Sequence, residues 1–144
     1  MPTLNAAISA SASALSAERV RIEAAVSNLA NAESTRGQNG GPYRRRDVVL
    51  ATEAVGTFDQ VLGRASTATG VKVAAVVEDQ APFRLRYEPS HPDANAEGFV
   101  ALPNVDPSEE MVDMLSAARA YQANLTAISL IRDLMQRALE LGRG

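Results

Sequence analysis

Few residues in this sequence are of the types that carry out chemistry. The single histidine, His91, stands beside Pro92 and Asp93, and such a pair could act as acid and base or hold a metal ion. The sequence has no cysteine and no second histidine, which excludes thiol catalysis, disulfides and zinc sites built from Cys and His. A lone histidine in a proline-rich stretch is more typical of a surface turn, and we interpret it as one.

Glu109 and Glu110 are adjacent carboxylates, a residue pair that can hydrolyse glycosides when it spans a cleft. They follow a helix start signal, where the helix dipole stabilises negative charge, so we interpret them as capping residues. The glycine-rich stretch Gly37–Gly41 would need a strand before it and a helix after it to form a phosphate loop, and the pattern around it is the reverse.

The densest charge cluster is Tyr43–Arg46, which could contact phosphate or an acidic protein face. Asp47 closes it and the net charge of the chain is −3, so we interpret it as a solvated strand edge or a salt-bridging patch. We therefore expect no catalytic residue, no cofactor, no metal, no small-molecule substrate and no nucleic-acid partner. A small hydrolase built from Glu, Asp and His91 is the enzyme alternative.

The positions of glycine and proline divide the 144 residues into three parts. Residues 108–141 lack both, residues 1–31 have only the proline at position 2, and the other six prolines lie between. We predict an α+β protein with an N-terminal helical part (1–35), a β-rich middle (36–106) and a C-terminal helical part (107–144). The two long helices are expected to pack as a coiled coil around a thin, alanine-rich seam.

Apolar residues recur every seven positions in both helical parts. The N-terminal stripe indicates a helix over about 6–31, and Asp106 followed by Pro107 is a start signal for the second helix. We expect the stripe to pack within the chain on Met111, Leu115, Ala118, Leu125 and Ile128. The N-terminal stripe is Ile8, Leu15, Ile22 and Leu29, and the C-terminal series are Met111, Ala118, Leu125 and Leu139, broken by Arg132, and Met114, Tyr121, Ile128 and Met135.

The second helix has more apolar residues than one partner helix could cover. Leu130, Ile131, Leu134 and Leu141 point to further faces, which predicts assembly with other chains. No run approaches the roughly 20 apolar residues of a membrane span, so we expect no membrane insertion. The N-terminus lacks the basic region of a secretory signal.

The middle part contains four strand signals. Phe83–Tyr87 alternates between apolar and basic residues, which predicts a half-buried strand. Tyr43–Leu50, Val71–Val77 and Gly98–Leu102 are the other candidates. Residues 51–70, rich in Ala, Thr and Gly, are expected to form a mobile loop.

Asn28 and Asn31 are unusual because asparagine is a poor residue for a helix interior. In an alanine-rich interface a polar Asn can fix the register, so we expect hydrogen bonds across helices or to neighbouring backbone, with Gln122 or Asn124 as partners. Helix termination with a capping role at Asn31 is the alternative.

Five sequence stretches together resemble the terminal signatures of the flagellar rod, hook and hook-filament junction protein family. They cover both ends of the chain, and the resemblance extends over its whole length. The stretches are Leu15–Ile22, Ser27–Ala32, Gly98–Asp106, Glu109–Met114 and Ser116–Asn124.

The resemblance implies a structural subunit of the proximal rod of the bacterial flagellar basal body, without catalysis. It implies export through the flagellar type III apparatus without a cleaved Sec signal, then helical polymerisation in the periplasm. The implied partners are other copies of the chain and the rod proteins FlgB, FlgF and FliE. The alternatives are another rod subunit similar to FlgB, and a soluble helical adaptor or export chaperone.

Subunit packing is expected to involve both terminal helices. The predicted packing residues are Ile8, Leu15, Ile22, Asn28, Leu29, Asn31, Met111, Met114, Leu115, Ala118, Tyr121, Gln122, Asn124, Leu125, Ile128, Ile131, Leu134 and Met135.

Overall fold

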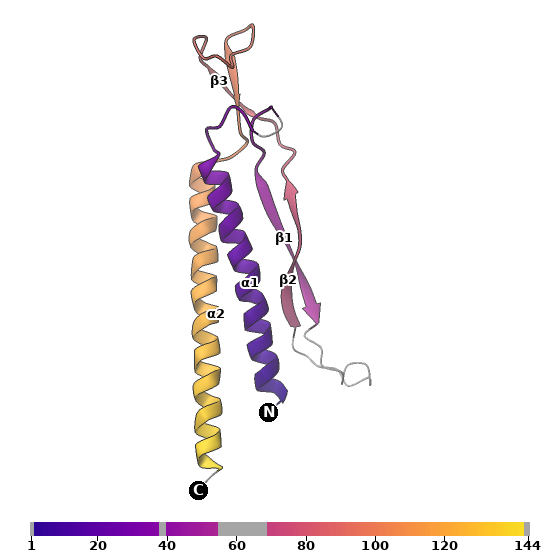
Figure 1. Ribbon diagram of the computed structural model, residues 1–144, viewed down its shortest axis with the longest axis vertical. Coiled ribbons are helices and arrows are strands. Elements are labelled where there is room, and N and C mark those ends of the chain that lie inside the picture. The colour runs from indigo at the N-terminus through magenta and orange to yellow at the C-terminus, as the bar shows by residue number, and fades with distance from the viewer. Residues whose placement is uncertain (1, 38–39, 55–68, 143–144) are drawn as a thin grey trace. The chain divides into compact units, whose positions relative to one another are not determined.

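The computed structural model describes residues 2–37, 40–54 and 69–142 of the chain. In chain order, the first and last elements are long helices, and four strands come between them in the sequence (Figure 1). This arrangement confirms the predicted α+β class. The elements are α1 (Pro2–Ala30), β1 (Arg46–Ala54), β2 (Thr69–Glu78), β3 (Arg84–Tyr87), β4 (Phe99–Leu102) and α2 (Pro107–Leu141).

Local polar contacts fix the facing ends of the two helices. α2 begins after Asp106, whose Oδ1 accepts a hydrogen bond from the backbone N–H of Ser108 at 2.8 Å. α1 ends at Ala30, and Nδ2 of Asn31 donates to the carbonyl oxygen of Ser27 at 2.8 Å. The predicted start signal and the capping alternative for Asn31 are both confirmed. Neither described helix is long and apolar enough to cross a membrane.

The strands form two separate two-stranded sheets. β1 and β2 run in opposite directions (Figure 1). β3 and β4 are antiparallel, with Arg84 opposite Leu102 and Tyr87 opposite Phe99. Each of the four predicted strand segments therefore contributes a strand. Of the segment 51–70 expected to be a mobile loop, residues 55–68 lie outside the described residues. At its two ends the expectation is wrong, because residues 51–54 belong to β1 and residues 69–70 to β2.

The chain folds into two compact units, each assembled from segments far apart in the sequence. The first unit draws on residues 1–20, 49–75 and 116–144, and the second unit on residues 21–48 and 76–115. The three-part division along the chain stays a prediction, because it follows chain order rather than contacts.

Buried apolar side chains are unevenly distributed between the units. The first unit buries Ala17 and Ala117. In the same unit, Ser13 Oγ accepts a hydrogen bond from the backbone N–H of Val71 at 3.1 Å, which joins α1 to β2. The second unit has the larger buried side chains, and its buried apolar residues are Ala25, Ala32, Val100, Leu102 and Val105.

β3 turns its basic side, and not its apolar side, toward the buried part of the second unit. Opposite residues of an antiparallel pair share one face of the sheet, so Arg84 and Arg86 share a face with the buried Leu102 and Val100. Nη2 of Arg84 donates to the carbonyl oxygen of Ala32 at 3.2 Å. The arginines thus use this face for hydrogen bonding.

The apolar side chains of β3 lie on the other face. Leu85 is 67% exposed and Tyr87 is 64% exposed. The expectation of a half-buried strand is therefore wrong, because all four residues of β3 are exposed. Alternation decides which residues share a face, but the partner strand decides which face is covered, and β4 places Val100 and Leu102 on the arginine side.

Candidate functional site

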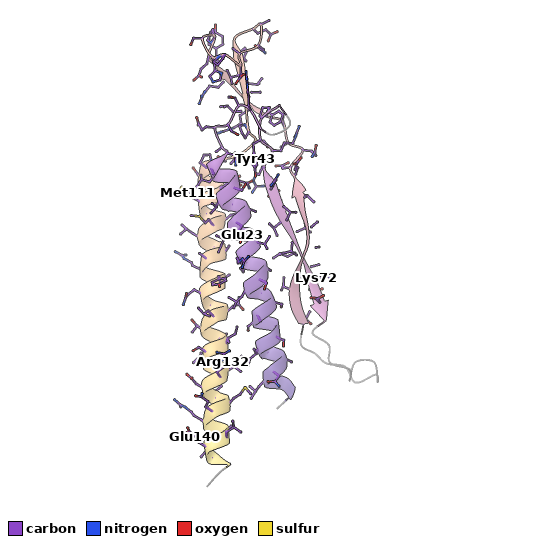
Figure 2. All side chains as sticks on the ribbon, viewed as in Figure 1. Glu23, Tyr43, Lys72, Met111, Arg132 and Glu140 are labelled. Atoms are coloured by element: carbon purple, nitrogen blue, oxygen red, sulfur yellow. The ribbon has the colours of Figure 1, made fainter. Side chains whose placement is uncertain are left out.

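Asn28 is the centre of a buried polar cluster in the second unit and is 1% exposed. Its Nδ2 donates to the Arg46 carbonyl oxygen and to Glu110 Oε2, each at 2.9 Å. Its Oδ1 accepts hydrogen bonds from the Arg46 backbone N–H at 2.9 Å and from the Tyr43 hydroxyl at 2.8 Å. These four bonds use the full hydrogen-bonding capacity of a primary amide. Figure 2 shows Tyr43 near the end of α1.

The amide of Asn28 binds both main-chain groups of Arg46, as a residue of a paired strand would. For Asn28, the expectation of hydrogen bonds across helices or to neighbouring backbone is confirmed. The expected partners were wrong: Asn124 donates to the carbonyl oxygen of Ala120 in its own helix at 2.9 Å, and Gln122 is exposed. Asn28 instead joins α1 to the start of β1 and the start of α2.

Glu110 is the second buried member of the cluster and is 2% exposed. Its Oε1 accepts a hydrogen bond from Arg45 Nε at 2.5 Å, while Oε2 is bound by Asn28. Arg45 also pairs with Asp47 at 2.6 Å and with Asp113 at 3.5 Å. Burial tends to lower the pKa of Arg45, but the hydrogen bond to Glu110 and the three carboxylates outweigh it and raise that pKa.

Interpreting Glu110 as a capping residue missed this role. Glu109 is exposed, as the capping interpretation expects, whereas Glu110 is turned inward. One signal in the sequence could have separated them. Glu110 stands four residues before Met114 and seven before Ala117, which places all three in one row along the same side of the helix.

The arginines of Tyr43–Arg46 point to different partners. The Arg44 guanidinium lies over the Phe83 ring at 4.4 Å and donates to the Asp79 carbonyl oxygen at 3.2 Å. The Arg46 guanidinium lies 5.7 Å from the centre of the Tyr43 ring. The ion pairs of Arg45 confirm the interpretation of the cluster as a salt-bridging patch.

His91 and Asp93 form part of a turn. His91 Nδ1 accepts a hydrogen bond from the Asp93 backbone N–H at 3.1 Å. The Asp93 carboxylate accepts hydrogen bonds from Arg36 Nε at 2.6 Å and from the Thr35 hydroxyl at 2.8 Å. The bond from Arg36, followed by that from Thr35, lowers the pKa of Asp93. Through these two bonds, Asp93 anchors the turn to the residues that follow α1.

The described residues offer little for ligand chemistry. A cavity of about 200 Å³ lies beside the polar cluster, and Ala25, Asn28, Arg45 and Glu110 contribute to its lining. The polar groups of Asn28, Arg45 and Glu110 are already bonded to one another, so they stabilise the fold rather than await a ligand. Among residues 2–37, 40–54 and 69–142, no three His, Cys, Asp or Glu side chains gather as a metal site.

α2 has one covered row, in which every residue is buried or half-buried. The predicted series through Met114 and Met135 lies in this row. The series through Met111, Ala118 and Leu125 does not: these residues are exposed, so their expected packing within the chain is wrong. The covered row is Glu110, Met114, Ala117, Tyr121, Asn124, Ile128, Ile131 and Met135.

Part of the covered row lies one residue before the predicted series: Ala117 is covered in place of Ala118, for example. The reason is that side-chain size does not decide which residues face inward. Ala117 is buried because a small side chain allows close approach, and Glu110 is buried because it has polar partners. Arg132, which interrupts the predicted series, is exposed and therefore disturbs no contact in the covered row (Figure 2).

The remaining predicted packing residues divide by exposure. Those of α1, and Asn31 just after it, are half-buried, apart from the buried Asn28, and those of α2 outside the covered row are exposed. The half-buried residues of this group are Ile8, Leu15, Ile22, Leu29 and Asn31, and the exposed ones are Met111, Leu115, Ala118, Gln122, Leu125 and Leu134.

The chain is similar to known flagellar proteins over nearly its whole length. It is 45% identical over 145 residues to the flagellar basal-body rod protein FlgC of Bacillus subtilis. The aligned region covers 94% of this chain and 96% of the relative. The FlgC of Salmonella typhimurium is 46% identical over 131 residues, covering 91% and 92%. That of Borreliella burgdorferi is 37% identical over 155 residues, covering 98% and 99%. Residues 96–141 match the family model for the C-terminal region of flagellar basal body rod FlgEFG proteins.

Proposed function

The chain belongs to the FlgC family of flagellar basal-body rod proteins, and from this premise we propose that it is a structural subunit of the rod. One observation in the structure carries the proposal: α2 leaves large apolar side chains exposed along its length. Leu115, Leu125 and Leu134 are all about half exposed or more. A helix with apolar residues outside its covered row needs further partners to bury them.

The exposed residues of α2 support assembly through the terminal helices. The contacts that hold a helical rod together are heterologous, because a rod grows without closing on itself. We propose that the packing residues exposed within one chain meet neighbouring subunits, and that the covered row of α2 stabilises the chain itself. The 18 predicted packing residues therefore divide into two roles according to their exposure.

Family membership also supports a more detailed placement. We propose that the chain lies in the proximal rod within the periplasm and contacts FlgB, FlgF and FliE. We further propose that it reaches the rod through the flagellar type III export apparatus, without a cleaved Sec signal. Each contact can be tested by site-specific cross-linking in isolated basal bodies.

We propose no catalytic role for the chain. The acid and base candidates His91, Asp93 and Glu110 have structural partners within the second unit. If a hydrolase activity existed, His91→Ala would abolish it. We expect His91→Ala to leave motility close to that of the wild type.

Replacing Leu125 with Asp tests assembly directly. Leu125 is 46% exposed, so the variant should fold and be expressed normally. It should fail to enter basal bodies, because a charge would then be buried at the subunit contact. Ser116→Asp, at an exposed polar position of the same helix, is the matched control and should assemble.

The measurements are swimming motility and the amount of chain in purified basal bodies, in cells without the native gene. Normal motility with Leu125→Asp would refute packing through α2. Fractionation tests the second candidate class, because a soluble adaptor or export chaperone stays in the cytoplasm and a rod subunit co-purifies with basal bodies.

A further inference from the structure

We propose that an apolar face of the second sheet docks onto the C-terminal part of α2 in another copy of the chain. This outer face is formed by Leu85, Tyr87, Phe99 and Ala101, which share one side of the β3–β4 pair. The inference rests on the proposed function, because it names a contact that an assembly of copies would use.

The outer face is a pre-formed aromatic surface. The rings of Tyr87 and Phe99 meet edge to face, with centroids 5.3 Å apart. Gly98 has φ of +83°, and a Cβ there would lie 2.9 Å from Cε2 of Tyr87 and 3.2 Å from Cγ of Pro89. The glycine thus lets the Tyr87 ring lie close against the backbone. A rigid aromatic group loses little conformational entropy when a partner binds.

The exposure of this face has a specific cause. The opposite face of β3 is bound to the rest of the second unit by Arg84, which reaches Ala32, and by Arg86, which pairs with Glu33 at 3.1 Å. The hydrogen bonds of the arginines thus hold the sheet with Leu85 and Tyr87 outward. A contiguous apolar face held outward in this way is typical of an interaction site.

α2 offers a receiving surface in its C-terminal part. An outer row, spaced by four, three and four residues, lies on one side of the helix and is exposed throughout. Leu130 and Leu134 are each 58% exposed, and Leu141 is 85% exposed. The outer row is Leu130, Leu134, Arg137 and Leu141.

Among the described residues, one unpaired charge of opposite sign stands beside each surface. Of the three carboxylates in residues 88–98, which connect β3 to β4, Glu88 pairs with Arg86 and Asp93 with Arg36, which leaves Glu97. Glu97 is exposed and stands two residues before Phe99, while Arg137 belongs to the outer row. Neither Glu97 nor Arg137 takes part in an ion pair within the described part of the chain. We assign them to each other across the contact.

The small size of the outer face favours a copy of the chain as its partner. Four residues bury far less than the roughly 800 Å² per partner of a stable complex. Such a face can act only between molecules that other contacts already hold together, where the effective concentration is high. Copies joined through α2 meet this condition. The outer face and the outer row differ, so the contact is heterologous and can repeat head to tail.

Engineered cysteines test the contact directly, because the chain has none of its own. Two differently tagged copies, one with Leu85→Cys and one with Leu134→Cys, are expressed together in cells without the native gene, and isolated basal bodies are oxidised. We expect a disulfide between the two tags. The matched control replaces Leu134→Cys with Gln136→Cys, which is exposed two residues further along α2 and therefore on another side of the helix, and which should not cross-link. Equal cross-linking of both pairs, or of neither, would overturn the proposal.

Substitutions at the surface provide a second measurement. Tyr87→Ser should lower incorporation into basal bodies about tenfold, the loss expected for one interfacial tyrosine. Glu97→Arg should also lower incorporation, and Arg137→Glu in the same chain should restore it. If wild-type chain enters basal bodies and these variants enter equally well, this inference fails while the proposed function stands. If wild-type chain does not enter, both fail.

Discussion

The two units of the chain are stabilised in different ways. The second unit buries Val100, Leu102 and Val105 and encloses the polar cluster of Asn28 and Glu110. The first unit buries alanines, while large apolar residues of α2 such as Leu125 and Leu134 remain exposed in it.

This difference concerns the kind of contact that holds each unit together. Directional hydrogen bonds with no unsatisfied buried side-chain atom among the described residues select one arrangement in the second unit. Buried alanine contributes little to stability, because the hydrophobic effect scales with the apolar area removed from water. Among the described residues, the second unit combines larger buried side chains with directional polar bonds and the first unit buries alanines, while both units leave large apolar side chains exposed.

The largest expected effect is the loss of Glu110. Glu110→Ala leaves the Arg45 guanidinium and the Asn28 amide without their buried partner and should lower the free energy of unfolding by about 3–5 kcal/mol. Glu109→Ala, at the exposed neighbouring position, should change it by less than about 0.5 kcal/mol. Urea unfolding of both variants measures the difference, and equal effects would mean that the cluster does not stabilise the second unit.

The two asparagines offer a comparison within one helix end. Asn28→Ala removes four hydrogen bonds in a buried site and should cost at least about 2 kcal/mol of stability. Asn31→Ala removes a half-buried bond to Ser27 and should cost about 1 kcal/mol or less. Thermal unfolding followed by circular dichroism measures both. A larger loss for Asn31→Ala would contradict the role assigned to Asn28.

Two neighbouring alanines test the position of the covered row in the first unit. Ala117 is 1% exposed, so Ala117→Leu should overpack the helix contact and lower stability by about 1–3 kcal/mol. Ala118→Leu adds the same side chain at an exposed position and should be nearly neutral in the isolated chain. If Ala118→Leu proved the more destabilising of the two, the row predicted from large residues would be the correct one.

The smallest expected effect is a pH dependence from Asp93. Its pKa is lower in the folded chain than its ordinary value of 3.8, so its contribution to stability is present above that value. The contribution is lost as the pH falls through the lowered pKa. Stability measured from pH 6 down to pH 2 should therefore fall less steeply in Asp93→Asn than in the wild type. Identical slopes would show that the pair with Arg36 does not stabilise the turn.

Periodicity predicted the elements, because it depends on local sequence alone. The start of α2 at Pro107 and the strand at Phe99–Leu102 follow from short-range signals. Residue types could not predict which face is covered, because the partner decides it. β4 places its buried residues on the arginine side of β3, so that side is the covered one. The covered row of α2 includes Glu110 because Asn28 and Arg45 reach it from distant segments. Buried polar residues are the main gap in such predictions.

The pairing of Asn28 with Arg46 has a consequence for solubility. A strand edge with free N–H and carbonyl groups can recruit strands from other molecules and start aggregation. At the first residue of β1, both groups that could recruit such a strand are occupied by a side chain of the same molecule. A single asparagine thereby closes the strand edge at that point.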